Sequence, residues 1–253
     1  MMSTSLFQKW ALAAICLLLA ACTASDQPDN SNGYAALKLS PESSTSTRRS
    51  ADVVEFFMYS CRHCHALDAP LNAWVRERRG THFERVPSAF SARDVPLQRL
   101  YFAVQALPNP EALHRSIFNA IHVQKLSFES EGSIADFMVR QGIERAAFVA
   151  AYHAPSVQQQ IDHALGLRHR YAIRGVPAIV VADRFLTSPA MMQGSSSTAD
   201  TSQPIEQATI RMLDHLLTQV GALSSAPAER DQGAHGIDVI AGKDRTATDR
   251  TTR

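Results

Sequence analysis

Residues 52–59 read DVVEFFMY, and after Asp52 apolar side chains occupy both alternating faces, with Glu55 as the exception. A strand that is apolar on both faces is typical of the buried centre of a sheet. Large apolar residues then recur at helical spacing and predict a helix that begins at or near Cys61: Leu67, Leu71, Trp74 and Val75. The run HFERVPSAF, residues 82–90, predicts a second strand.

From about Val95 to His169 the strand signals vanish and the apolar period becomes helical. Helices are expected at 95–107, 110–123, 131–141, 143–153 and 156–170. Strand character returns in VPAIVVAD, residues 176–183, and a last helix fits residues 204–220. This order predicts an α/β, thioredoxin-like fold formed by residues 51–94 and 171–222, with an all-helical insertion at 95–170 between them.

The two ends of the chain differ from this folded part. Residues 10–21 form an apolar run of 12 residues after a single positive charge, which is short of the roughly 20 residues of a spanning helix. We therefore interpret residues 1–21 as a signal peptide. Residues 19–22, Leu-Ala-Ala-Cys, span its end and resemble a bacterial lipobox, which predicts lipid attachment at Cys22. The alternative is an ordinary signal peptide followed by a chance cysteine. The polar residues 22–50 are expected to be a flexible tether, and 223–253 a disordered tail.

Charge and cysteine content narrow the possible functions. The formal net charge is +1 without a basic stripe, so nucleic acid is not an expected partner. If Cys16 leaves with the signal peptide and Cys22 is acylated, Cys61 and Cys64 are the remaining thiols of the four. A single pair so close in sequence is poorly suited to scaffolding, because its ring restrains the unfolded chain only slightly. The pair is better suited to chemistry.

The string Cys61-Arg62-His63-Cys64-His65 fits two kinds of site. It matches the C-x-x-C-H pattern of c-type haem attachment, with His65 as an axial ligand, and also the C-x-x-C pattern of thioredoxin-like redox proteins. A zinc site built on the two cysteines is a third possibility, although no second matching ligand pair follows. The other histidines, His114 and His122 among them, show no metal-ligand spacing and are expected at the surface or as capping residues.

Three segments together resemble the DsbA family of thiol:disulfide oxidoreductases. They are VEFFMYSCRHC with its helix, FERVPSAF, and IRGVPAIVVADRF, and the resemblance covers about residues 51–221. It favours redox chemistry over haem or zinc, because the haem interpretation leaves the buried strand and the Gly-Val-Pro loop unexplained. No cofactor beyond the Cys61–Cys64 disulfide is expected.

The resemblance implies roles for individual residues. Cys61 is expected to be the nucleophile at a helix N-terminus, where backbone N–H groups favour a thiolate, and Cys64 the buried resolving thiol. His63 is expected to stabilise the thiolate. Arg62 departs from the Pro-His pair that is commonest in the family. Its fixed positive charge is expected to stabilise the thiolate further, and the departure puts the redox potential in doubt more than the reaction.

Two further positions follow from the same resemblance. Glu55 matches an acidic position beneath the active site, and a role in proton transfer with Cys64 is expected, with an edge or partly solvated acid as the alternative. Val176 and Pro177 occupy the place of the family's cis Val-Pro bond, beside which an extended substrate would bind by strand addition.

These assignments predict an enzyme of the Gram-negative periplasm, held to a membrane through Cys22, which donates its disulfide to reduced exported proteins. A DsbB-like inner-membrane oxidase would recycle it. We expect a monomer, because no dimerisation domain is visible. The alternatives are a reductase or isomerase on the same fold, a c-type haem protein, and a non-catalytic lipoprotein that uses the fold for binding.

Overall fold

A five-stranded mixed sheet forms the centre of the molecule, in a computed structural model that describes residues 32–39, 52–128, 130–195 and 203–225. The strands are β1 (Tyr34–Ala36), β2 (Val53–Phe57), β3 (Phe83–Pro87), β4 (Ala178–Val181) and β5 (Phe185–Thr187). Their order is β1-β5-β4-β2-β3. Strands β2 and β3 are parallel, and the other pairs are antiparallel. The mixed α/β thioredoxin-like fold predicted from the sequence is confirmed.

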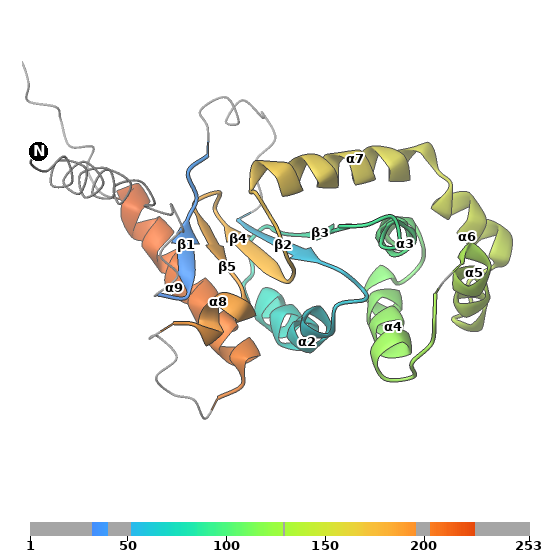
Figure 1. Cartoon of the computed structure of the whole chain (residues 1–253), viewed down its shortest axis with the longest axis horizontal. Helices are drawn as coiled ribbons and strands as arrows, with labels where there is room; N and C mark the ends of the chain where they lie inside the picture. Colours follow the sequence, from blue (N-terminus) through green and yellow to red (C-terminus); the bar gives the residue numbers. More distant parts are fainter. Residues whose placement is uncertain (1–31, 40–51, 129, 196–202, 226–253) are drawn as a thin grey trace, which may run out of the picture.

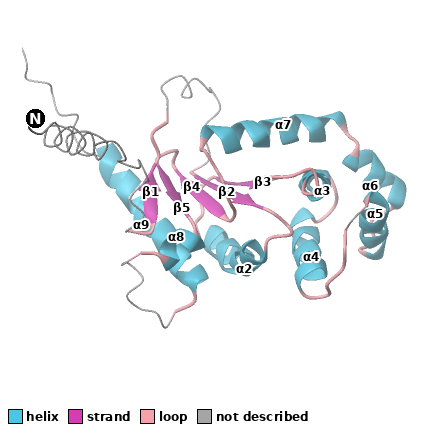
Figure 2. Ribbon diagram, viewed as in Figure 1, coloured by secondary structure: helices cyan, strands magenta, loops and turns pink. Residues whose placement is uncertain are grey.

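Helices cover both faces of this sheet (Figures 1 and 2). The helices of the described residues are α2 (Arg62–Glu77), α3 (Val95–Gln105), α4 (Pro110–His122), α5 (Glu131–Arg140), α6 (Arg145–Tyr152), α7 (Pro155–Arg170), α8 (Pro189–Gln193) and α9 (Ile205–Ser225). Helices α3 to α7 form the inserted segment. Of these, α3 to α6 form the helical lobe, which lies to one side of the sheet in Figure 1, and α7 runs from the lobe back over one face of the sheet. The predicted insertion of helices between β3 and β4 is therefore present.

Strand β2 is buried on both faces, which explains why its sequence has no polar face. All five of its residues are buried. Val53 packs with α2 and α9 through Leu67, Leu71 and Leu213, whereas Val54 and Phe56 pack on the opposite face with Ala164 of α7 and Tyr171. Phe57, at the end of the strand, belongs to the core of the helical lobe. This strand therefore contributes to the core around the sheet and to the core of the helical lobe, and its carboxyl end leads to Cys61.

Two predicted boundaries are wrong. Residues 22–50 were expected to be a flexible tether, but Tyr34–Ala36 form β1 and pair antiparallel with β5. Thr187 adds a hydrogen bond from its Oγ1 to the carbonyl of Gly33 (2.7 Å). The tail was expected from residue 223, but α9 continues to Ser225. The predicted signal peptide, Cys22 and the rest of the tail lie outside the described residues.

Candidate active site

Cys61 is the N-cap residue of α2, at the carboxyl end of the central strand. Its Sγ accepts a hydrogen bond from the backbone N–H of Cys64 (3.3 Å) and donates one to the carbonyl oxygen of Val176 (3.5 Å). The side chain is partly exposed, and both cysteines are free thiols in this structure. A helix N-terminus has unpaired N–H groups and a positive dipole end, so this position favours a negatively charged sulfur.

The pKa of the Cys61 thiol is lowered from 9.0 to about 6. The largest cause is the hydrogen bond with the Cys64 side chain, and burial opposes it. The backbone N–H groups of Cys64 and His63 and the charge of the His63 imidazole lower the pKa further. Cys61 is therefore a thiolate over much of the neutral pH range, which is the reactive form of a cysteine.

Cys64 has the opposite character. It is completely buried and packs into the core of the helical lobe. Burial raises its pKa far above the ordinary value, and the hydrogen bond and charge of Cys61 raise it further. The two thiols of one helical turn thus differ strongly in acidity: one is exposed enough to meet a substrate, and the other is protected from it.

Both residues between the cysteines are exposed. Arg62 donates a hydrogen bond from Nε to Nε2 of His63 (3.2 Å), so the guanidinium lies beside the imidazole. His63 contributes to the low pKa of Cys61 through its backbone N–H and its charge. The role of Arg62 in setting the redox potential stays a prediction.

The loop between α7 and β4 closes the site on its other side. The peptide bond between Val176 and Pro177 is cis. The Val176 carbonyl faces the Cys61 sulfur, and Pro177 is buried at the start of the strand segment that enters β4. The structure therefore brings together Cys61, Cys64 and Val176, although 115 residues of sequence separate the first from the last.

Glu55 lies within the sheet and is only 2% exposed. The alternative expectation for Glu55, an edge or partly solvated acid, is therefore wrong. Arg85, its neighbour on β3, binds Oε2 of Glu55 through Nε at 3.0 Å. Burial raises the pKa of Glu55 to about 7, against the lowering effect of Arg85. The charge of Glu55 in turn contributes to the high pKa of Cys64.

A buried polar network extends from this ion pair into the helical lobe. Asp68 of α2 lies 3.5 Å from Arg85 and accepts a hydrogen bond from His114 Nε2 at 3.0 Å. The other ring nitrogen of His114 is bonded to the hydroxyl of Tyr59 at 2.9 Å. His114 is 1% exposed, so its expected surface position is wrong. Burial lowers its pKa and favours the neutral ring.

Sequence reasoning did not identify Arg85, Asp68 or His114. One available signal was spacing, because Cys61, Cys64 and Asp68 follow each other at three and four residues and so share one side of a helix. Nothing comparable marks His114, which reaches the site from α4.

His65 and His122 stack on each other at the end of α4. Their ring centroids are 4.8 Å apart with an interplanar angle of 9°. His122 also bonds the carbonyl of Tyr59 through Nε2 (2.8 Å), so its expected role as a surface or capping residue is only partly right. Burial lowers the pKa of His65, and the charge of His122 lowers it further. His65 is thus packed between α2 and the helical lobe.

Within the described part of the chain, no group of three or more His, Cys, Asp or Glu residues is arranged to hold a metal ion. None of the described helices combines the length and the apolar character needed to span a membrane.

A dithiol at a helix N-terminus, facing a cis-proline loop on a thioredoxin-like sheet, defines a thiol:disulfide oxidoreductase. A family model described as the DSBA-like thioredoxin domain matches residues 75–205. The chain belongs to the DsbA family of thiol:disulfide interchange proteins. The match to a thiol:disulfide interchange protein DsbA from Burkholderia cepacia has 35% identity over 182 residues, which cover 72% of this chain and 81% of the relative.

A second relative agrees with this assignment, and solved structures share the fold. A DsbA from Bordetella pertussis is 34% identical over 156 residues, covering 61% of this chain and 74% of the relative. The crystal structure of Pseudomonas aeruginosa DsbA matches with a TM-score of 0.66 at 22% identity, over 77% of this chain and 95% of that one. DsbA from Xylella fastidiosa matches with a TM-score of 0.60 at 25% identity, over 75% and 96%. The haem interpretation of the cysteine motif is thereby overturned.

Proposed function

We propose that this oxidoreductase is a disulfide donor that oxidises exported proteins through Cys61 and Cys64. The observation that carries the proposal is the contrast between the two thiols, with the pKa of Cys61 lowered to about 6 and that of the buried Cys64 raised. Each unit by which the thiol pKa lies below the ambient pH favours the reduced form by about 1.4 kcal/mol. A protein whose reduced form is stabilised gives its disulfide away readily.

The reaction starts from the disulfide form. A substrate thiolate attacks the Cys61 sulfur, the Cys61–Cys64 bond breaks, and a mixed disulfide between substrate and Cys61 forms while Cys64 takes up a proton. A second substrate thiolate then attacks the substrate sulfur of the mixed disulfide and releases the Cys61 thiolate. The substrate loses two electrons to the enzyme, which ends as the dithiol.

We assign Glu55 to the proton transfer. The Cys64 thiolate is a poor leaving group because burial raises its pKa, so it needs a proton as the disulfide breaks. Glu55 has a pKa of about 7 and interacts electrostatically with both cysteines, which fits a group that gives and accepts protons at neutral pH. His63 and Arg62 would stabilise the Cys61 thiolate on the exposed side.

The backbone at Val176 and Pro177 is the proposed substrate-binding segment. The Val176 carbonyl lies against Cys61, so an extended substrate that pairs with this loop places its cysteine beside the reactive sulfur. Reduced exported proteins would be the substrates.

The remaining assignments follow from family membership and from the N-terminal sequence. We place the protein in the periplasm, as a monomer recycled by a DsbB-like, quinone-linked oxidase of the inner membrane. The lipobox at residues 19–22 supports attachment by lipid at Cys22. Replacement of Cys22 by serine should move the protein from the membrane to the soluble periplasmic fraction. A distribution unchanged by this substitution would contradict the anchor.

The deciding experiment is the equilibrium redox potential of the Cys61–Cys64 pair in a glutathione buffer, measured on the chain that begins after Cys22. A potential well above that of the glutathione couple is expected. A potential near that of thioredoxin would instead place the protein among the reductases or isomerases of the same fold.

A further inference from the structure

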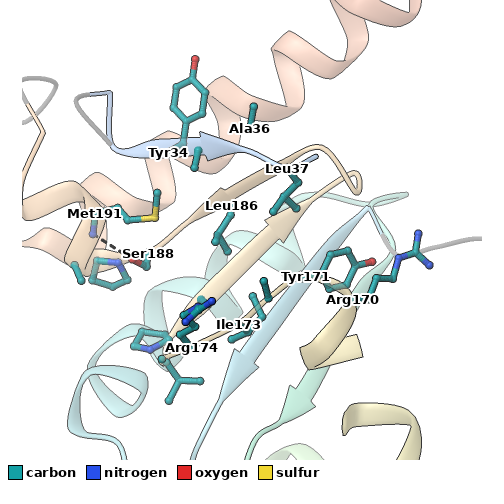
Figure 3. A pocket seen from close by; sticks show the side chains of 18 of the residues that line it. Tyr34, Ala36, Leu37, Arg170, Tyr171, Ile173, Arg174, Leu186, Ser188 and Met191 are labelled. Atoms are coloured by element: carbon teal, nitrogen blue, oxygen red, sulfur yellow. Dashed lines mark hydrogen bonds between the residues drawn. The ribbon is translucent and has the colours of Figure 1, made fainter. Parts of the chain in front are cut away.

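A long open groove, with a volume of about 1310 Å³, begins beside the active site. His63, Val176 and Pro177 line one end of it. The rest is lined by residues 170–175 at and after the end of α7, by β1 and residues 37–39, by Leu186 of β5 and by the start of α8. Figure 3 shows Ile173 and Leu186 in the middle of the groove, with Leu37 and Tyr34 toward β1. Its floor is thus apolar, and its position is continuous with the proposed substrate-binding loop.

The charged residues of this groove all have the same sign. Lys38, Arg170 and Arg174 line it, and no Asp or Glu does so within the described ranges. Arg170 is paired with Asp183 at 3.2 Å, which neutralises it. Arg174 and Lys38 are exposed and take part in none of the ion pairs found among the described residues. Among the described residues, two cations without an ion-pair partner therefore line the groove beside the proposed substrate-binding loop.

Of these two cations, Arg174 is the closer along the chain to Val176, whose carbonyl contacts the reacting sulfur. It precedes Val176 by two residues, and the Val176 carbonyl is 3.5 Å from the Cys61 sulfur. Two residues of extended chain span about 7 Å at most. A flexible arginine side chain at this distance can meet the side chains that flank the cysteine of a bound substrate.

We propose that the groove selects substrate segments that carry an acidic side chain within a few residues of the reacting cysteine, and that Arg174 recognises this acid. The inference rests on the proposed function, because it names the substrate class of the same site. Exposed ion pairs are weak, so the selectivity should be a few-fold and should act largely on the encounter rate, which salt suppresses. Lys38 would add to it when a second acid lies farther along the groove.

The test uses the Cys64→Ser variant and peptides whose single cysteine is activated as a mixed disulfide with 2-mercaptopyridine. The Cys61 thiolate attacks the peptide sulfur, the peptide–pyridyl S–S bond breaks, pyridine-2-thione leaves, and a Cys61–peptide disulfide forms. This reaction reports encounter at Cys61 and is independent of the protein's own redox potential. The peptides differ in one residue, Glu, Gln or Lys, placed two positions before or two positions after the cysteine.

At low salt, the Glu peptide of at least one series should react about two- to fivefold faster than its Gln counterpart, and the Lys peptide more slowly. The difference should shrink as salt is added. Arg174→Gln should abolish the preference, and Arg174→Glu should reverse it. Arg115→Gln, at an exposed arginine of α4 outside the groove, is the matched control and should leave the preference unchanged.

Equal rates for the Glu and Lys peptides in both series would overturn the proposal. An acidic preference that survives Arg174→Glu would also overturn it, because the selecting charge would then lie elsewhere, for example on Arg62. The proposed function is checked separately by mixing the disulfide form of the parent protein with a Gln peptide that has two cysteines. Failure to oxidise this peptide, with the charge preference intact, would contradict the donor function alone.

Discussion

The carboxylate of Glu55 and the guanidinium of Arg85 form a buried ion pair, 3.0 Å apart, at paired positions of β2 and β3. A neighbouring cation ordinarily lowers the pKa of a carboxyl group. Here burial dominates, and the pKa of Glu55 is about 7. Glu55 interacts electrostatically with both cysteines, so the sheet holds, near the dithiol, a group that can exchange protons at neutral pH.

Replacing Glu55 by glutamine should flatten the pH dependence of stability of the disulfide form. The folded pKa of about 7 exceeds the ordinary 4.5, so the folded protein binds this proton more tightly than the unfolded chain. Stability should therefore fall as pH rises from about 4.5 to about 7, by on the order of 3 kcal/mol. Urea unfolding between pH 4.5 and 8 measures it. The control Glu77→Gln, at an exposed site of α2, should show the same loss of stability with rising pH as the parent protein. If Glu55→Gln shows this loss as well, Glu55 is not its cause.

The Cys61 thiolate should titrate near pH 6. Alkylation of the reduced protein by iodoacetamide should follow a single ionisation with this midpoint, because only the thiolate reacts. His63→Gln should move the midpoint upward, since it removes the imidazole charge while keeping the backbone N–H. A midpoint near 9 in the parent protein would contradict the proposed role of the helix N-terminus.

The same ionisation should appear in the stability of the reduced form. The folded pKa of Cys61 is depressed from 9.0 to about 6, so its stabilisation is complete above pH 9 and is lost as pH falls toward 6. The free energy of unfolding of the reduced form, minus that of the disulfide form, should therefore increase from pH 6 to pH 9. Urea unfolding of both forms at three pH values checks the sign, and a difference that shrinks over this range would refute it.

His114→Leu should destabilise the protein by about 2–4 kcal/mol, because it leaves the buried carboxylate of Asp68 and the hydroxyl of Tyr59 without their shared partner. In a Tyr59→Phe background the cost should be smaller by about 1 kcal/mol, since one of the two stranded groups is absent. Arg115→Ala, at the adjacent exposed position, should change stability by less than about 0.5 kcal/mol. Strictly additive costs in the double variant would show that the hydrogen bond to Tyr59 contributes nothing.

Gly33→Ala and Gly166→Ala should have opposite effects on stability. Gly33 has φ of +79°, and an added Cβ would lie 2.7 Å from Met192 Sδ, so alanine there should cost about 1–3 kcal/mol. Gly166 lies within α7 with no atom within 4 Å of an added Cβ, so alanine should stabilise by up to about 1 kcal/mol. Thermal unfolding compares both with the parent protein. A neutral Gly33→Ala would mean that β1 contributes little to the fold.

Much of the fold was predictable because its signals are local. The double-faced apolar pattern of β2, the helical period after Cys61 and the run of helices between residues 95 and 170 each depend on neighbours in sequence. Strand β1 was missed for the opposite reason. It is three residues long, lies in a polar segment, and exists through pairing with β5 and the bond from Thr187 to Gly33.

The cysteine spacing and the Gly-Val-Pro sequence determined the class of chemistry, because a C-x-x-C pair at the start of a helix already brings both thiols within one turn. What only the tertiary structure decided is the environment of those thiols. Arg85 meets Glu55 across a sheet, and His114 reaches Asp68 from another helix, over 30 and 46 residues of sequence. The burial that shifts these pKa values arises when distant segments pack together and exclude water, and no local pattern encodes which segments will meet.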